Sequence, residues 1–281
     1  MTEMRVVDVT DPDDPLLDDL RDLNKSDKRP DLPGGRGLVI AEGTYVVGRM
    51  LLSRFTPHVM LGTDLRLEQL RREATAEGWD ADERAGDAVY LRASKDLISE
   101  VIGFRSSRDI LAAADRPEPL SVESVVDGAQ TLVVLEGVND PENLGAIFRN
   151  CAALGVDGVL FGAAAGDPLY RRVVRVSMGH VLRLPFAHLP GTPTTWQRSL
   201  EGLHEQGFRT VALTPYADTP LSRAVDAEKV AFLLGAEGPG LTEHAMKACD
   251  VRAAIPMADG TDSLNVATAA AVAFYERARE G

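Results

Sequence analysis

The chain has 281 residues, 44% of them hydrophobic, and a formal net charge of −13. This length and apolar content are typical of a globular protein with room for two domains, and they exclude a disordered chain. Charges interrupt every long apolar run, and the first residues are acidic. We therefore expect neither a membrane span nor a signal peptide and predict a cytoplasmic protein.

The negative charge argues against general nucleic-acid binding, because phosphate contacts require Lys and Arg. The first 23 residues carry eight acids and two bases, however, and the remainder is only mildly acidic. Local basic patches decide where a polyanion docks. Candidate positions, each of which is also consistent with a solvated surface charge, are Lys25, Lys28, Arg29, Arg36, Arg105, Arg108, Arg171, Arg172, Arg175 and Arg183.

Three segments precede the most regular part of the chain. Residues 1–36 are rich in Asp, Pro and Gly and predict a loosely ordered acidic arm with one short amphipathic helix. Residues 37–112 alternate short β patterns with helical ones, which predicts a small α/β domain. Residues 113–124 contain two prolines that break this pattern, so we expect a linker there.

Residues 125–281 predict an α/β domain built on a parallel sheet. Its candidate strands are short and continuously apolar, as expected for strands that helices cover on both faces. Ligands of such sheets bind at the carboxyl ends of the strands. The candidate strands are residues 131–135, 158–161, 180–184, 210–213, 230–234 and 251–255.

Three polar clusters follow predicted strands of this domain. The first is GVNDPENLGAIFRNCAALG at 137–155, with Asn143 near the start of a helix. Arg149 lies about 120° around the helix from Asn143, whereas Asn150 lies close to the face of Asn143. Taken alone, the pattern is equally consistent with a capping Asn143 and a solvated Arg149.

The second cluster, LLGAEGPGL at 233–241, surrounds Glu237 with glycines that let the backbone approach a ligand closely. It lacks the Gly-Lys-Ser/Thr ending of a phosphate loop, and no dinucleotide-binding G-x-G-x-x-G follows the first strand. The third cluster, IPMADGTDSLNVATAAAVAFYE at 255–276, places Ser263 and Asn265 at the mouth of an apolar helix. Ser263 by itself is more simply explained as an N-cap.

The two cysteines, Cys151 and Cys249, lie in apolar helical patterns. No Cys/His spacing suits zinc. We therefore interpret both as small buried hydrophobic residues and expect no metal.

In this order and spacing, the three clusters resemble the signature motifs of the SpoU/TrmH family of S-adenosylmethionine-dependent RNA ribose 2′-O-methyltransferases, members of the SPOUT superfamily. The resemblance covers residues 131–281 and is most specific in the SLNVA and NLGAIFRNCAALGV segments. It implies a parallel-sheet SPOUT domain with a C-terminal trefoil knot, an exception to the usual absence of knots. Residues 37–110 resemble, more weakly, the RNA-substrate-binding domain that many members carry in front.

The resemblance also implies roles for individual residues. Arg149 corresponds to the catalytic arginine of the first motif, Asn143 to its companion and Glu237 to the glutamate of the second. Ser263 and Asn265 correspond to the polar pair of the third motif. Family members bind S-adenosyl-L-methionine largely through the backbone of the knot loops, which here implicates Leu213, Thr214, Gly235, Glu237, Ile255, Met257 and Leu264.

Family members are homodimers that pack near the cofactor site, so Arg149 is expected to act in its own subunit or across the interface. Ala236 departs from the family pattern, because many members have Asn there. Guanidinium groups resist deprotonation. We therefore expect Arg149 to bind the adjacent RNA phosphate and stabilise a developing alkoxide, while that phosphate or a water molecule accepts the proton.

The implied function is methylation of a ribose 2′-hydroxyl in structured RNA, either rRNA or tRNA. Two alternatives keep the same fold: a non-catalytic RNA-binding or ribosome-assembly protein, and a SPOUT enzyme that modifies another RNA atom. A nucleotide-binding enzyme of Rossmann type is disfavoured because its glycine fingerprint is missing.

Overall fold

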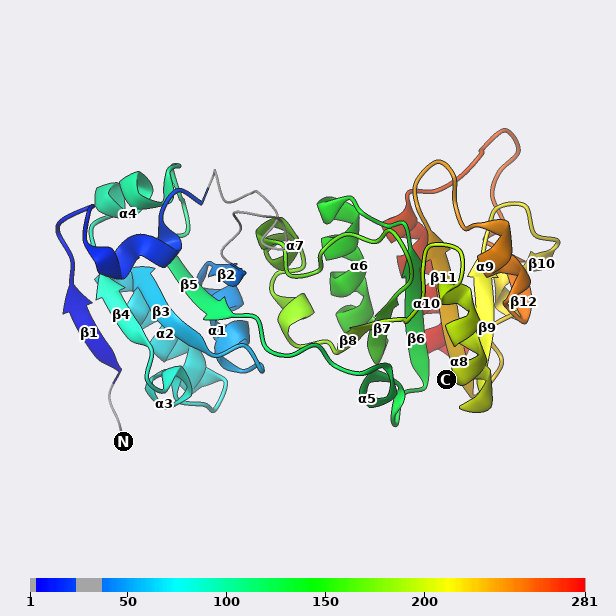
Figure 1. Cartoon of the computed structure of the whole chain (residues 1–281), viewed down its shortest axis with the longest axis horizontal. Helices are drawn as coiled ribbons and strands as arrows, with labels where there is room; N and C mark the ends of the chain where they lie inside the picture. Colours follow the sequence, from blue (N-terminus) through cyan, green and yellow to red (C-terminus); the bar gives the residue numbers. More distant parts are fainter. Residues whose placement is uncertain (1–3, 24–36, 281) are drawn as a thin grey trace. The chain divides into compact units, whose positions relative to one another are not determined.

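The computed structural model of the chain describes residues 4–23 and 37–280. The chain divides into two compact units (Figure 1). Unit 1 consists of the residues up to Glu118 together with Asp167–Arg183, and unit 2 of Pro119–Gly166 together with Leu184–Gly281. The first division therefore falls within the segment 113–124 that the sequence predicts to be a linker.

Unit 1 is built on a five-stranded mixed sheet in the order β1-β4-β3-β5-β2. β1, β4 and β3 are parallel, and β5 is antiparallel to both β3 and β2, so β1 to β4 all end at one edge of the sheet. The strands are β1 (Arg5–Asp8), β2 (Leu38–Glu42), β3 (Pro57–Gly62), β4 (Val89–Arg92) and β5 (Ile110–Asp115). The helices are η1 (Pro15–Leu20), α1 (Thr44–Leu51), α2 (Asp64–Ala76), α3 (Ala81–Ala85), α4 (Lys95–Ile102), α7 (Arg171–Val176) and η2 (His180–Leu182).

The described part of the N-terminal segment differs from the predicted loosely ordered arm. β1 pairs in register with β4, and η1 buries Leu17 and Leu20 in the core beneath the sheet. His58 Nε2 lies 2.9 Å from Asp19 Oδ2 and links η1 to β3. η1 confirms the short amphipathic helix predicted in this segment, and Leu17 and Leu20 are spaced for its buried face. Four of the proposed basic positions, Lys25, Lys28, Arg29 and Arg36, lie outside the described residues.

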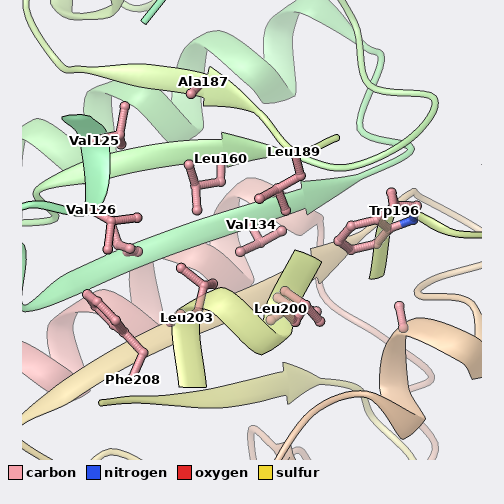
Figure 2. Packing of buried hydrophobic residues seen from close by; sticks show 14 of the residues in the cluster. Val125, Val126, Val134, Leu160, Ala187, Leu189, Trp196, Leu200, Leu203 and Phe208 are labelled. Atoms are coloured by element: carbon pink, nitrogen blue, oxygen red, sulfur yellow. The ribbon is translucent and has the colours of Figure 1, made fainter. Parts of the chain in front are cut away.

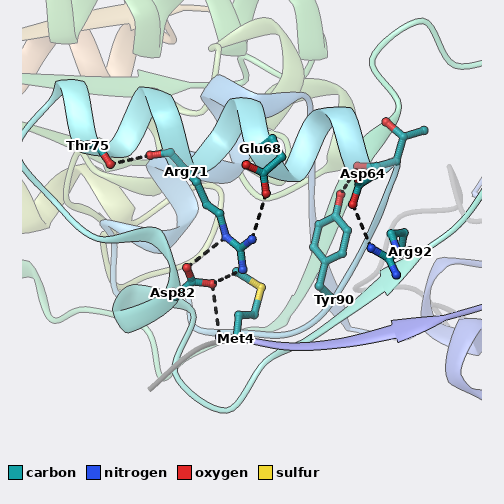
Figure 3. A network of polar contacts seen from close by, with 9 residues as sticks. Met4, Asp64, Glu68, Arg71, Thr75, Asp82, Tyr90 and Arg92 are labelled. Atoms are coloured by element: carbon teal, nitrogen blue, oxygen red, sulfur yellow. Dashed lines mark hydrogen bonds and ion pairs between the residues drawn. The ribbon is translucent and has the colours of Figure 1, made fainter. Parts of the chain in front are cut away.

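A polar network ties α2 to its neighbours in unit 1 (Figure 3). The Arg71 guanidinium donates Nε to Asp82 Oδ2 at 3.0 Å and Nη2 to Asp82 Oδ1 at 2.9 Å, a bidentate pair that joins α2 to α3. Asp82 and Glu68 raise the pKa of Arg71, with the Asp82 hydrogen bond as the main cause. The backbone N–H of Met4 also donates to Asp82, at 3.2 Å, so the same carboxylate fixes the start of β1.

Residues Asp167–Arg183 group with unit 1, although the sequence analysis placed them inside the domain 125–281. Arg171 explains part of this grouping, because its guanidinium lies 3.4 Å from Glu42 Oε2 and stacks over the ring of Phe104. The strand expected at 180–184 is also wrong. That segment begins as η2, with Val181 and Leu182 buried, so its apolar character reflects packing instead of a strand.

Unit 2 is built on a seven-stranded sheet in the order β10-β12-β9-β11-β6-β7-β8. Every pair of neighbours is parallel, which confirms the predicted parallel α/β sheet. The strands are β6 (Thr131–Glu136), β7 (Gly158–Phe161), β8 (Phe186–His188), β9 (Phe208–Leu213), β10 (Thr219–Pro220), β11 (Lys229–Gly235) and β12 (Val251–Ala254). Five of the six predicted strands are therefore confirmed.

Helices cover both faces of this sheet, as the continuous apolar strands require. On one face Trp196, Leu200 and Leu203 pack against Val134 and Leu160 (Figure 2). On the other, α10 packs along α6 and contacts β11. Ring centroids of Phe232 in β11 and Phe274 in α10 lie 5.9 Å apart. The helices are α5 (Val122–Val126), α6 (Pro141–Ala153), η3 (Trp196–Ser199), α8 (Leu200–Glu205), η4 (Leu221–Arg223), α9 (Glu243–Lys247) and α10 (Val266–Glu280).

Both cysteines are free thiols in unit 2. Cys151 is fully buried in α6, and Cys249 is half-buried with its Sγ donating to the Ala245 carbonyl at 3.3 Å. Across residues 4–23 and 37–280, no helix is long and apolar enough to cross a membrane.

Candidate cofactor and catalytic site

A cavity of about 780 Å³ opens at the carboxyl ends of β9, β11 and β12. Three loops line it, one after each of these strands, as expected for a ligand site of a parallel sheet. The lining includes all seven residues for which the family resemblance implies cofactor contacts: Leu213, Thr214, Gly235, Glu237, Ile255, Met257 and Leu264. Ser263 and Asn265 line it as well.

The loop after β11 folds tightly back on itself. Gly240 N donates to the Ala236 carbonyl at 3.0 Å, and Gly238 and Gly240 adopt φ values of 87° and 69°. A Cβ on Gly235 would lie 2.2 Å from the backbone of Gly240 and Leu241, so only glycine fits there. The glycines of the second polar cluster are therefore required by this turn, which holds Glu237 at the cavity.

A buried carboxylate that the sequence analysis did not single out anchors this loop. Glu136 ends β6 beside Gly235 and is only 5% exposed. Its Oε2 accepts from Thr242 N at 2.8 Å, and its Oε1 accepts from Thr242 Oγ1 at 3.0 Å and from Trp196 Nε1 at 2.9 Å. Thr242 is the N-cap of α9, so Glu136 fixes the far end of the loop. An acid that terminates an apolar strand was the available signal.

Asn265 joins the three polar clusters. Its Nδ2 donates to Asn143 Oδ1 and to Glu237 Oε1, both at 2.7 Å. Its Oδ1 accepts from the backbone N–H groups of Ala267 at 3.0 Å and Thr268 at 3.1 Å, at the start of α10. One amide therefore caps α10 and holds α6 and the β11 loop against it. Short side-chain bonds of this kind restrict the geometry of a site more than surface contacts do.

The N-caps of α6 and α10 are not the residues that the sequence alone suggested, Asn143 and Ser263. Asp140, not Asn143, caps α6, since its Oδ1 accepts from Glu142 N at 2.8 Å and Asn143 N at 3.1 Å. Asn143 is left free to turn its side chain toward Asn265 and is buried. Likewise Asn265 caps α10, and Ser263 is an exposed residue of the preceding loop. The N-cap explanation of Ser263 is therefore wrong.

The structure separates Arg149 from this junction. Asn150, one residue further along α6, donates Nδ2 to the Ala267 carbonyl at 2.9 Å and so faces α10 with Asn143. Arg149 is exposed on another side of the helix, as the helical spacing predicted. Within residues 4–23 and 37–280 its guanidinium has no hydrogen-bond or ion-pair partner. Its five N–H donors are available to an external anion.

The loop after β9 carries a second feature that the sequence analysis missed. Thr214 N donates to the Ala253 carbonyl at 3.0 Å, and Thr219 pairs with Ala253 at the other end of the loop. Between these two anchors, Tyr216 lines the cavity with 90% of its surface exposed. No periodic pattern marks a single aromatic residue in a short loop, so the sequence carried no signal for it.

The lining of the cavity suits a cationic ligand that has an apolar ring. Leu213, Leu234, Ile255 and Leu264 supply apolar surface. Among the described residues that line the cavity, none is Lys or Arg, and the acids are Glu237, Glu243 and Asp262. Arg252 partly neutralises Glu243, with Nη2 3.1 Å from Oε2. The remaining negative charge favours a sulfonium or ammonium group.

The model of the SpoU rRNA Methylase family matches residues 130–275, more than half of the chain. The chain belongs to the SpoU rRNA methylase family. This membership confirms the resemblance seen in the three polar clusters. SpoU methyltransferases use S-adenosylmethionine as their cofactor. The apolar, acidic cavity fits that molecule, because it offers apolar surface for the adenine and negative charge for the sulfonium.

Two relatives illustrate the similarity in sequence. An uncharacterized tRNA/rRNA methyltransferase of Mycobacterium tuberculosis is 57% identical over 281 residues, covering 98% of this chain and 93% of the relative. The 23S rRNA (guanosine-2′-O-)-methyltransferase RlmB of Bordetella pertussis is 30% identical over 221 residues, covering 77% of this chain and 89% of the relative.

Two solved structures have the same fold. The AdoMet-bound rRNA methyltransferase of Sinorhizobium meliloti has a TM-score of 0.73 and 24% identity, covering 98% of both chains. The SpoU methyltransferase AviRb of Streptomyces viridochromogenes in complex with AdoMet has a TM-score of 0.76 and 20% identity, covering 95% of this chain and 98% of that one.

Proposed function

We propose that this RNA methyltransferase transfers a methyl group from S-adenosylmethionine to a ribose 2′-hydroxyl of rRNA or tRNA. The observation that carries the proposal is the Asn265 junction, which draws Asn143 and Glu237 together at the rim of a cavity suited to the cofactor. The relative RlmB is a 23S rRNA (guanosine-2′-O-)-methyltransferase, which supports the ribose hydroxyl as the acceptor.

The cavity residues hold the methyl donor in this proposal. Gly235 and the turn that follows it offer backbone groups, while Leu213, Ile255 and Leu264 offer apolar contacts. The bound cofactor supplies an electrophilic methyl group on a positively charged sulfur. Glu237 lies at the same rim with its carboxylate held by Asn265, so its charge is fixed where a cationic group enters.

Arg149 acts on the RNA in this proposal. A ribose hydroxyl is a weak nucleophile at neutral pH, and methyl transfer needs its proton removed and the reacting atoms held in line. Arg149 binds the phosphate next to the target ribose and stabilises the developing alkoxide, and that phosphate or a water molecule accepts the proton. Its exposed position on α6 suits a group that meets a partner outside its own chain.

The proposed enzyme has four further features: its oligomeric state, its knot, the role of Ser263 and the role of unit 1. We propose a homodimer, in which Arg149 serves the site of its own subunit or of the partner, and a trefoil knot formed by the C-terminal segment around the cavity. Ser263, exposed at the cavity, contacts the RNA or the cofactor. Unit 1 selects the RNA target, since RNA is recognised largely through shape and unstacked bases.

Methylation with tritiated S-adenosylmethionine tests the proposal directly. Total RNA from cells that lack the protein is incubated with the purified chain, digested and separated into nucleosides. A labelled 2′-O-methylnucleoside is the expected product. A labelled base would assign the chain to another SPOUT activity, and absence of label with intact cofactor binding would favour a non-catalytic RNA-binding protein.

A further inference from the structure

One edge of the unit 1 sheet collects features that attract an anion. β2, β3 and β4 end there, and α1, α2 and α4 begin there. Ligands of α/β sheets bind at this kind of edge, outside the carboxyl ends of the strands. The N–H groups in the first turn of each helix point toward the same side and carry partial positive charge.

A cavity of about 180 Å³ lies at this edge, next to the start of α1. Its lining includes Gly43, Thr44, Tyr45, Arg66 and Arg108, which we call the arginine pocket. Both arginines are fixed mainly by neutral acceptors. Arg66 donates Nη1 to Gln69 Oε1 at 2.6 Å and Nη2 to the Ser107 carbonyl at 3.4 Å. Arg108 donates Nη1 to the Glu42 carbonyl at 3.1 Å.

The nearby carboxylates are engaged by other cations. Asp109 Oδ2 lies closer to Lys95 Nζ, at 2.9 Å, than to Arg66 Nη2, at 4.0 Å. The Glu42 carboxylate lies 3.4 Å from the Arg171 guanidinium. The two pocket arginines therefore leave a surplus of positive charge. The Arg66 side chain is 27% exposed, so part of its guanidinium is accessible to an external anion.

The start of α1 completes the pocket. Gly43 is the N-cap with φ 96° and provides no side-chain acceptor for the first N–H groups. A Cβ on Gly43 would lie 3.1 Å from Arg108 Cδ, so glycine keeps the helix start open beside the guanidinium. Tyr45, in the first turn of α1, is 58% exposed. Its ring is available next to the N–H groups and the two arginines.

We propose that the arginine pocket binds a backbone phosphate of the RNA substrate and that Tyr45 stacks on a neighbouring unpaired base. The inference rests on the proposed function, which makes RNA the substrate. Phosphate-binding guanidinium groups beside an exposed aromatic ring are the combination with which proteins hold single-stranded RNA segments. The net charge of −13 makes such a local site decisive, because most of the surface repels a polyanion.

The test measures binding of the full-length chain to unmodified rRNA transcripts and total tRNA at several salt concentrations. Arg108→Gln is expected to weaken binding by about tenfold and to lower the slope of log K against log salt by about 0.7 for one lost phosphate contact. Tyr45→Ala is expected to weaken binding by about five- to a hundredfold, whereas Tyr45→Phe retains it. Arg72, exposed on the same α2 helix as Arg66 and about 9 Å further along its axis, provides the matched control Arg72→Gln.

S-adenosylmethionine affinity, measured by calorimetry, separates this inference from the proposed function. All variants should keep wild-type cofactor affinity and wild-type melting temperature. Wild-type RNA affinity and salt slope in both Arg108→Gln and Tyr45→Ala would overturn the inference, even if the wild-type chain methylates RNA. An equal loss in Arg72→Gln would overturn it as well, because general surface charge would then explain the binding. If the wild-type chain binds no RNA at any salt concentration, both proposals fail.

Discussion

The polar groups at the carboxyl ends of the parallel strands are paired differently in the two sheets. In unit 2 the edge is locked, because one asparagine and one buried carboxylate bind their neighbours through short hydrogen bonds. In unit 1 the edge is open, with guanidinium and N–H donors that still have capacity for an external acceptor. A reacting centre needs atoms held to a fraction of an ångström. A polyanion needs mainly charge and surface.

The largest expected effect is the loss of methyl transfer on substitution of Arg149, a group of unit 2 that is not held by hydrogen bonds within the described chain. Arg149 is exposed and unpaired within the described chain, so it resembles the donors of unit 1. Arg149→Ala should lower methyl transfer by about 10³-fold, as removal of one transition-state donor does. S-adenosylmethionine affinity should stay within twofold. Single-turnover kinetics with tritiated cofactor, alongside calorimetry, measures both, and near-normal turnover would remove Arg149 from the mechanism.

Asn265→Ala removes the side chain at the centre of the hydrogen-bonded junction of unit 2. The variant loses the cap of α10 and the bonds to Asn143 and Glu237, so we expect a loss of about 1–2 kcal/mol in unfolding free energy. Methyl transfer should fall by about 100-fold, because α6, the β11 loop and the start of α10 lose their common anchor. Urea denaturation and turnover assays measure the two effects. Thr268→Val, which removes only a 3.5 Å contact to Asn265, is the matched control and should change little.

Glu136→Gln tests the second anchor of the same edge. The amide keeps the shape but loses one acceptor oxygen and the negative charge that strengthens the bonds to Thr242 and Trp196. We expect about 1–3 kcal/mol lower stability and a cofactor affinity weakened by about tenfold. Calorimetry and thermal melting measure these changes. Unchanged cofactor affinity would show that the loop does not depend on Glu136.

Salt provides a smaller and more general comparison of the two edges. RNA affinity should fall steeply between about 50 and 200 mM salt, because counterions compete for the phosphates. Cofactor affinity should change by less than about threefold, since the proposed cofactor site offers mainly backbone and apolar groups and lacks Lys and Arg among its described lining residues. Parallel titrations of the same preparation decide the point, and equal salt slopes would contradict it.

The smallest expected effect concerns the thiols. Burial raises the pKa of Cys249 to about 12 and raises that of Cys151 further. A raised pKa keeps the thiol protonated, so at pH 8 almost no nucleophilic thiolate is present. Iodoacetamide should therefore leave the native chain unmodified and its activity unchanged. Mass spectrometry after reaction tests this, with urea-unfolded protein as the positive control.

The sequence predicted the parts of unit 2 that repeat a simple pattern. Continuous apolar strands identified the parallel sheet, and glycines beside Glu237 marked the loop at the cavity. It could not predict which asparagine would join the clusters, because that depends on the packing of α6 against α10. Glu136 was missed because a carboxylate at a strand end carries no periodic signal. The short helix that carries Leu17 and Leu20 was predicted, but its packing into the core of unit 1 was not, because the surrounding acids suggested a loosely ordered arm.

The segment Asp167–Arg183 leaves unit 2, joins unit 1 and returns, so the backbone passes between the units three times, at Glu118, Gly166 and Arg183. A protease that nicks the chain near Pro119 would consequently leave residues 1–118 held only by noncovalent contacts with Asp167–Arg183, which stays covalently joined to unit 2 at both of its ends. Unit 1 cannot be transplanted as one uninterrupted piece, and a fragment that starts at Pro119 would carry α7 without the strand it packs on. Exchanging unit 1 with that of a relative therefore requires moving two separate stretches of gene together.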